Sequence, residues 1–158
     1  MEPTIRTAGP DDADTIYEFI VALAVYEKEE DAVEATAESL RQQMHAAVPP
    51  FECLILEDAG EPRGFALFFH NYSTWRGAQG LYLEDLFVPS EFRGKGYGKK
   101  LLRSLARIAV ERGCPRMEWQ VLDWNEPAIS FYESIGADVK RDWFPCRLDG
   151  SALQSLAE

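Results

Sequence analysis

The sequence predicts an α/β (α+β) domain in which a mixed, mostly antiparallel sheet carries helices on its faces. Strand-like runs follow one another along the middle of the chain, and helical patterns precede and follow them. The 158 residues have the size of one ordinary domain, and 46% hydrophobic with 27% charged residues is an average globular composition. No internal repeat or linker composition interrupts the chain, so we expect a single domain over residues 1–158.

The amino-terminal third predicts a short strand followed by two helices. Residues 4–7 form an extended start, and Pro10-Asp11-Asp12 then opens a helix whose acidic first turn suits the helix dipole. A weaker helical pattern runs from about Thr36 to Ala46, with Leu40 and Met44 on one face. The apolar residues of the first helix recur at helical spacing and are Ile16, Phe19, Ile20, Leu23 and Ala24.

Three strands and a long helix are expected in the middle of the chain. The runs 51–57, 64–70 and 81–88 are separated by turn residues, which predicts an antiparallel meander. A glycine-rich turn leads from the third run into a helix that stops at Gly113. The predicted buried stripe of this helix is Leu101, Leu105, Ile108 and Ala109.

The carboxyl-terminal part predicts further strands around one short helix. Residues 116–121 read as a strand, and Pro127 suits the first turn of a helix over 128–135. Gly136 then takes the C′ position, where a left-handed conformation is needed. We expect a last strand or two within 137–148 and a final helical turn over 151–157.

Charge and cysteine usage exclude several classes of partner. With 27 acidic and 16 basic residues the formal charge is -11, which repels nucleic acid and anionic lipid and attracts small cations. The opening residues lack the pattern of a secretion signal, and no apolar stretch approaches the roughly 20 residues of a membrane span. Cys53, Cys114 and Cys146 suit a reducing, cytoplasmic compartment. The two histidines lie in no metal-binding pattern, so no metal site is expected.

The most informative segment is the turn Arg93-Gly94-Lys95-Gly96-Tyr97-Gly98. Alternating glycines let backbone N–H groups converge on an anion, and the following helix adds its own unpaired donors and its dipole. Arg93 and Lys99 supply mobile positive charge, so the segment predicts a phosphate or pyrophosphate site. It is neither a Walker A loop nor a dinucleotide fingerprint, because Arg93 and Lys99 stand where those motifs need glycine. A tight glycine turn without a ligand is the alternative.

The pattern R-x-x-G-x-G of this turn resembles the coenzyme A pyrophosphate loop of the GNAT acetyltransferases. Other segments, spread in order through most of the chain, look like the spermidine/spermine acetyltransferase-like branch of that family. The resemblance implies the GNAT fold with helices on both faces of the sheet, acetyl-CoA as cofactor and direct transfer of acetyl to a primary amine. The segments that carry it are Leu23–Glu27, Leu81–Val88, Trp124–Ile129, and Phe131-Tyr132 with Gly136-Ala137.

The resemblance also implies where acetyl-CoA binds, in a split between two neighbouring strands. The backbone of Leu86, Phe87 and Val88 would pair with the pantetheine arm and polarise the thioester carbonyl, as fixed N–H dipoles do in an oxyanion hole. Asn125 would hydrogen-bond the arm. The residues expected to hold the pyrophosphate are Arg93, Gly94, Lys95, Gly96, Tyr97, Gly98 and Lys99.

Two residues are candidates for proton transfer. Tyr132 matches the family's general acid, which protonates the departing thiolate, and a phenol near pKa 10 suits a thiol near 8.5. Its alternative role is a core aromatic beside Phe131. Glu84 is the candidate base for the substrate ammonium. Strand alternation places Glu84 and Asp85 on opposite faces unless a bulge intervenes, and an exposed strand carboxylate is the alternative for each.

A pocket for an ammonium group needs carboxylates and aromatic faces. Two departures from polyamine enzymes of the branch replace acidic residues near the expected pocket, with Ser73 at one place and Lys140 and Arg141 at the other. We therefore hypothesise a diamine or diamino acid, lysine- or ornithine-like, at least as readily as spermidine. The candidates for substrate binding are Glu27, which matches the family position, together with Trp75, Glu84, Asp85 and Trp124.

The resemblance further implies a homodimer, because members of this branch are often homodimers whose sites draw residues from both subunits. Three alternative functions stay open at this point. One is acetylation of a protein amino terminus or lysine, another is a non-catalytic module that senses acetyl-CoA, and the third is a general phosphate binder.

Overall fold

The computed structural model describes all residues 1–158, which form two compact units, Met1–Gln120 and Val121–Glu158. The first unit contains a five-stranded sheet in the order β1-β2-β3-β4-β5. The first four strands form an antiparallel meander and β5 pairs with β4 in parallel, so the predicted α/β class with a mixed sheet is confirmed. The strands are β1 (Thr4–Thr7), β2 (Glu52–Asp58), β3 (Glu61–Ser73), β4 (Ala78–Phe87) and β5 (Met117–Glu118).

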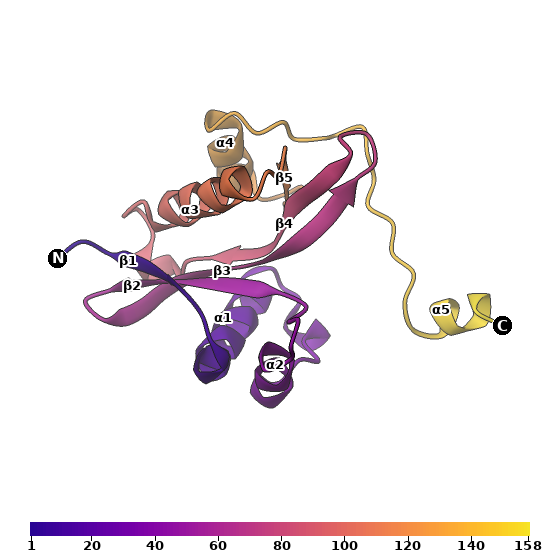
Figure 1. The fold of residues 1–158 in the computed structure, drawn as a ribbon, viewed down its shortest axis with the longest axis horizontal. Coiled ribbons are helices and arrows are strands. Elements are labelled where there is room, and N and C mark those ends of the chain that lie inside the picture. Colours follow the sequence, from indigo (N-terminus) through magenta and orange to yellow (C-terminus); the bar gives the residue numbers. More distant parts are fainter. The chain divides into compact units, whose positions relative to one another are not determined.

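Helices cover both faces of this sheet (Figure 1). Two of them, α1 (Ala13–Tyr26) and α2 (Ala37–Met44), lie on one face, and α3 (Tyr97–Glu111) lies on the other. The ring of Phe19 in α1 stacks on Phe65 of β3 with centroids 5.1 Å apart. Three short 3-10 helices occur in the loops, η1 (Pro10–Asp12), η2 (Glu30–Ala32) and η3 (Ser90–Phe92).

An unbroken run of apolar side chains in β2 explains why both faces are covered. In β2, Cys53 and Ile55 belong to the core cluster beneath α1, and the intervening Leu54 is buried as well. Successive strand residues point to opposite faces, so a strand that is apolar at every position needs a layer on each side. In α3 the predicted stripe is buried at Leu101, Leu105 and Ala109; Leu102 joins it, whereas Ile108 is only half-buried.

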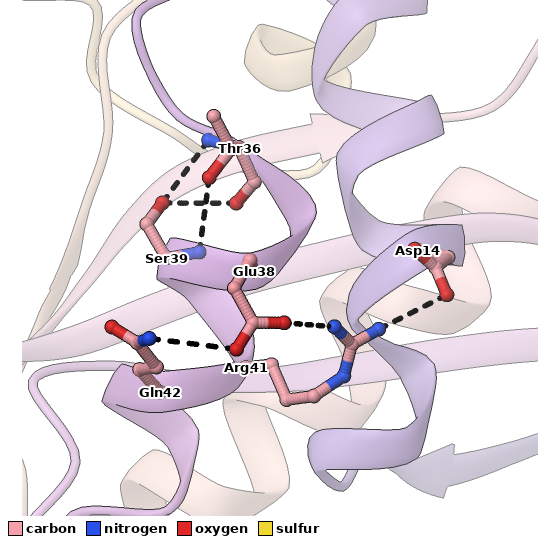
Figure 2. Close-up of polar contacts among 6 residues, drawn as sticks. All are labelled: Asp14, Thr36, Glu38, Ser39, Arg41 and Gln42. Carbon is pink, nitrogen blue, oxygen red and sulfur yellow. Dashed lines mark hydrogen bonds and ion pairs between the residues drawn. The ribbon is translucent and has the colours of Figure 1, made fainter.

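A hydrogen-bonded cap and an ion-pair bridge hold α2 in place, as Figure 2 shows. The hydroxyl of Thr36 accepts from the N–H of Ser39 at 3.0 Å, and the hydroxyl of Ser39 accepts from the N–H of Thr36 at 3.0 Å. Arg41 donates to Glu38 in its own helix at 2.7 Å and to Asp14 in α1 at 3.0 Å. The cap fixes the start of α2, because it satisfies a donor that the first helical turn leaves open. The ion pair of Arg41 with Asp14 ties α2 to α1.

The second unit contains two helices, α4 (Glu126–Ser134) and α5 (Gly150–Leu156). Gly136 has φ 93° after α4, as expected, and its N–H donates to the carbonyl of Glu133 while that of Ala137 donates to Tyr132. The strand expected within 137–148 is wrong, because this unit offers no second strand to complete a ladder. The strand expected over 116–121 is reduced to β5. No helix in the structure is long and apolar enough to cross a bilayer.

We expect Thr36→Ala to lower the free energy of unfolding by about 0.5–2 kcal/mol, because the first N–H groups of α2 lose their capping hydroxyl. Urea unfolding followed by circular dichroism measures the change. Thr36→Ser keeps the hydroxyl and should retain most of the stability. An unchanged midpoint in Thr36→Ala would show that the cap does not stabilise α2.

Candidate active site

The strand β4 is hydrogen-bonded along its length on one side only. Its partner β3 pairs with it from Phe65 to Ser73, whereas β5 pairs with it only at Leu81 and Tyr82. Beyond Tyr82 this edge of β4 therefore has no strand partner within the first unit. An unpaired edge presents N–H and C=O groups to any extended ligand.

The three residues expected to hold the pantetheine arm lie at the end of this open edge. Phe87 and Val88 have buried side chains and Leu86 is half-buried, so their backbones are the groups left to pair. Main-chain donors fixed on a strand need no reorganisation when charge develops on a bound carbonyl. The arrangement fits an extended, amide-containing chain laid along β4.

The side chain of Arg93 folds back onto this end of β4. Its Nε donates to the carbonyl of Val88 at 2.9 Å, and its Cζ lies 4.6 Å from the ring centroid of Tyr26 and 5.6 Å from that of Phe87. A planar guanidinium stacks on aromatic faces, which explains why Arg93 is held in this position and is not the mobile charge that the sequence suggested. Arg93 thus connects the end of α1 with the end of β4.

The glycine turn is open on its outer side. Gly94 and Gly96 have φ of 83° and 78°, which favours glycine at both positions, and a Cβ at Gly94, Gly96 or Gly98 would meet nothing within 4 Å. The N–H of Lys100 is the first in α3 to bond within the chain, to Gly96 O at 3.0 Å. The N–H groups of residues 94–99 before it form no hydrogen bond within the chain, and the positive end of the helix dipole favours an anion there.

The remaining side chains of the turn differ in their exposure. Lys95 and Lys99 are exposed and form no ion pair, so both are able to neutralise a phosphate. Tyr97 is buried and donates its hydroxyl to Asp58 at the end of β2, a bond that raises the pKa of Tyr97. Only the backbone of Tyr97 is left for a ligand.

A β-bulge re-aims the acidic residues of β4. Leu67 pairs with Asp85 and Phe68 pairs with Leu83, so Glu84 is an extra residue without a partner in β3. A bulge breaks the simple alternation of side chains along a strand. The bulge that the sequence analysis left open is therefore present, with Glu84 exposed and Asp85 half-buried.

Three carboxylates interact electrostatically at this bulge. Burial, followed by the charges of Glu84 and Glu27, raises the pKa of Asp85 to about 6. Burial, followed by the charge of Glu29, also raises the pKa of Glu27, which ends α1. Neighbouring carboxylates disfavour one another's ionised form, and a bound cation relieves that repulsion. The cluster Glu27, Glu84 and Asp85 is thus suited to bind an ammonium and accept its proton.

The tryptophan of the β3–β4 hairpin lies away from this cluster within the first unit. Trp75 is 84% exposed at the hairpin tip, and the seven residues from Ala78 to Glu84 span about 20 Å. Ser73 is buried, and its hydroxyl accepts from the N–H of Arg76 at 3.1 Å. The position where polyamine enzymes carry an acid is therefore a turn-forming residue here.

The other predicted residues belong to the second unit. Asn125 is the N-cap of α4, and its side-chain oxygen accepts from the N–H of Ala128 at 3.4 Å. Tyr132 is half-buried on α4 with its ring centroid 5.6 Å from that of Phe131, and Trp124 is 46% exposed before the helix. The cap and the Schellman turn at Gly136 fix the two ends of the helix that carries Tyr132.

Sequence reasoning missed two residues that support the site, Tyr26 and Asp58. Tyr26 lies beside Glu27 in a segment already singled out, so its neighbour was the signal. Asp58 precedes a hairpin turn, and nothing in its sequence surroundings points to a bond with Tyr97, which is 39 residues away.

We expect Asp85→Asn to stabilise the protein at neutral pH. The pKa of Asp85 lies above that of the unfolded chain, so the native state binds more protons and stability falls as pH rises from about 4 to about 6. Asparagine removes this penalty, which amounts to up to about 3 kcal/mol. Urea unfolding at pH 4 and pH 8 measures it, with Glu34→Gln as the exposed control. Equal destabilisation at both pH values would contradict the assignment.

Comparison with known proteins identifies the family to which the chain belongs. The acetyltransferase (GNAT) family model matches residues 14–137. The thialysine N-epsilon-acetyltransferase of Bos taurus is 37% identical over 164 residues, covering 97% of this chain and 96% of the relative. The L-ornithine N5-acetyltransferase of Arabidopsis thaliana is 50% identical over 93 residues, covering 59% of this chain and 41% of the relative.

Two further similarities concern the branch and the fold. The human spermidine/spermine N(1)-acetyltransferase-like protein 1 is 37% identical over 163 residues, covering 97% of this chain and 23% of that protein. The solved structure of an integron cassette protein from the V. cholerae mobile metagenome has a TM-score of 0.82 at 28% identity, covering 100% of this chain and 99% of that one. The predicted family and its spermidine/spermine acetyltransferase-like branch are confirmed, and the chain belongs to the acetyltransferase (GNAT) family.

Proposed function

We propose that this acetyltransferase moves the acetyl group of acetyl-CoA directly to a primary amine of a small cationic substrate, a diamine, polyamine or diamino acid. The observation that carries the proposal is the open edge of β4, which has a glycine turn at its end and a cluster of carboxylates at its bulge. Enzymes of the family use acetyl-CoA as acyl donor. We propose that residues 1–158 act as one domain, and the family match across both units supports this.

Main-chain groups and two lysines hold the acyl donor in this proposal. The backbone of residues 86–88 pairs with the pantetheine arm and polarises the thioester carbonyl, and the N–H groups after Arg93 bind the pyrophosphate with Lys95 and Lys99. Asn125 adds a hydrogen bond to the arm. What supports this is that the β4 edge and the outer side of the glycine turn are both open.

Proton transfers frame the attack of the amine on the thioester. Asp85 or Glu84 accepts a proton from the ammonium, because only a neutral amine has a free electron pair. The nitrogen then forms a bond to the carbonyl carbon and the carbon–sulfur bond breaks. Tyr132 gives its proton to the leaving thiolate and recovers one from the new amide nitrogen. A carboxyl pKa of about 6 at Asp85 supports the first step, since the group is ionised at neutral pH and more basic than an ordinary aspartate.

We further propose a diamino acid, lysine- or ornithine-like, as the preferred substrate. Its side-chain ammonium meets the cluster of Glu27, Glu84 and Asp85, and its carboxylate meets a basic residue. The names of the bovine and Arabidopsis relatives, which refer to thialysine and L-ornithine, support this class. The replacement of a pocket acid by Ser73 supports it too, because fewer carboxylates favour a shorter cation.

A cytoplasmic homodimer completes the proposal. The second unit leaves large apolar side chains in solvent, and exposed apolar groups of this size mark surfaces that associate. These side chains are Trp143, Phe144, Leu148, Leu153 and Leu156. In the proposed homodimer, Trp75 contributes to the substrate pocket of the partner subunit. Three unpaired cysteines support a reducing compartment.

A panel of amines tests the substrate class. With acetyl-CoA held at saturation, we expect kcat/KM for lysine, thialysine or ornithine to exceed that for spermine at least roughly tenfold, the difference made by one well-paired charge. Mass spectrometry of the products identifies the nitrogen that is acetylated. A clear preference for spermine over every amino acid would overturn the substrate class, and turnover of peptides alone would overturn the small-amine proposal.

We expect Tyr132→Phe to lower kcat by about 10²- to 10⁴-fold, because the leaving thiolate loses its proton donor while the ring is kept. The KM for acetyl-CoA should change little, since the hydroxyl acts after the donor has bound. Phe131→Leu is the matched control on the same helix and should retain most of the rate. If Tyr132→Phe retains the full kcat, the tyrosine is not the acid.

A further inference from the structure

The β2–β3 hairpin contacts the glycine turn on both sides. Asp58, the last residue of β2, accepts a hydrogen bond from the hydroxyl of Tyr97, which lies near the end of the turn and is the first residue of α3. Arg63 in β3 places its Cζ 4.3 Å from the ring centroid of Phe92, which precedes the turn. Two side chains of one hairpin thus hold the two rings that flank residues 93–96.

This hairpin is a rigid support. Asp58 pairs with Glu61 across a two-residue loop, and the loop residues Ala59 and Gly60 have φ of 54° and 78°. Positive φ at both positions is the geometry that matches the twist of the flanking strands. Arg63 is the extra residue of a bulge in β3, between Pro62, which pairs with Glu57, and Gly64, which pairs with Leu56. A bulge directs its side chain, so the backbone of the hairpin places both Asp58 and Arg63.

Between Arg93 and Tyr97 the turn has little to hold it. A side chain at Gly94 or Gly96 would touch nothing within 4 Å, and Lys95 is exposed. Glycine has the largest backbone freedom to lose on ordering, so a turn built from glycines needs its order from neighbouring residues. Tyr97 supplies a buried ring, 4% exposed, whose hydroxyl requires a polar partner.

We propose that Asp58 is a positioning residue for diphosphate binding. Through Tyr97 it holds the N–H donors of the turn in the arrangement that fits a diphosphate, while Arg63 holds the other end through Phe92. The inference rests on the proposed function, in which this turn binds the pyrophosphate of acetyl-CoA. Preorganised donors bind more tightly because the ligand does not have to order them.

The test uses acyl donors with and without the diphosphate. We expect Asp58→Ala to raise the Kd for acetyl-CoA by roughly tenfold, the effect of losing one hydrogen bond to a charged group. The kcat/KM for S-acetylpantetheine, which lacks the nucleotide, should stay unchanged, and so should kcat at saturating acetyl-CoA. Asp58→Asn keeps an acceptor and should restore most of the affinity. Tyr97→Phe should reproduce Asp58→Ala, and the double variant should add nothing further.

Calorimetric titration and steady-state kinetics on the full chain supply these values, with the exposed Tyr72→Phe as control. Equal loss with acetyl-CoA and S-acetylpantetheine, or a lower melting temperature with unchanged Kd, would show that the bond is structural only. Unchanged affinity in well-folded Asp58→Ala would overturn the inference as well. Should Asp58→Ala fail to fold, the comparison of Tyr97→Phe with Tyr72→Phe decides. Weaker acetyl-CoA binding in Tyr97→Phe alone supports the inference, and unchanged binding in Tyr97→Phe overturns it. Failure of the unsubstituted chain to bind acetyl-CoA would instead overturn the proposed function.

Discussion

The pairing of β4 on one side only is the constraint on which the rest of the site depends. Because β5 pairs with β4 only at Leu81 and Tyr82, the backbone of β4 from the bulge to Phe87 is paired on its β3 side and open on the other. The strand then runs into the glycine turn and α3, so backbone donors of two kinds, strand and helix start, follow one another along the chain. One extended ligand with an anionic end satisfies both.

Charge is distributed to suit two different ligands. Residues 93–107, which include the turn and most of α3, contain six basic and no acidic side chains, whereas residues 11–38, which include α1, contain ten acidic and one basic. These two segments lie on opposite faces of the sheet (Figure 1). The field therefore favours an anion at the start of α3 and a cation beside the end of α1, although the chain as a whole is acidic.

Much of the fold follows from local pattern, and the parts of the site that do not follow are those set by pairing between distant segments. The apolar run in 51–57 and the helical stripe around Leu101 and Leu105 reflect burial, which each segment displays by itself. The bulge at Glu84 depends on the register between β3 and β4, which no single strand contains. The expected strand within 137–148 fails for the same reason, because its sequence allows a strand but does not supply a partner.

The side-chain contacts of the turn show the same limit. The positive φ at Gly94 and Gly96 was predictable, because glycine adopts this conformation readily and most other residues do not. The attachment of Arg93 to Val88 and Tyr26, and of Tyr97 to Asp58, joins residues that only the folded sheet brings together. The family resemblance implies a role for the motif, and the structure shows the contacts that hold it.

Amide hydrogen exchange with and without acetyl-CoA is the most direct test of the open β4 edge. The account predicts slower exchange in two places at once, the backbone of residues 83–88 and the turn 94–99, with no change in β1 and β2. Protection of the turn alone, or of neither segment at saturating ligand, would contradict the claim that β4 pairs with the acyl donor.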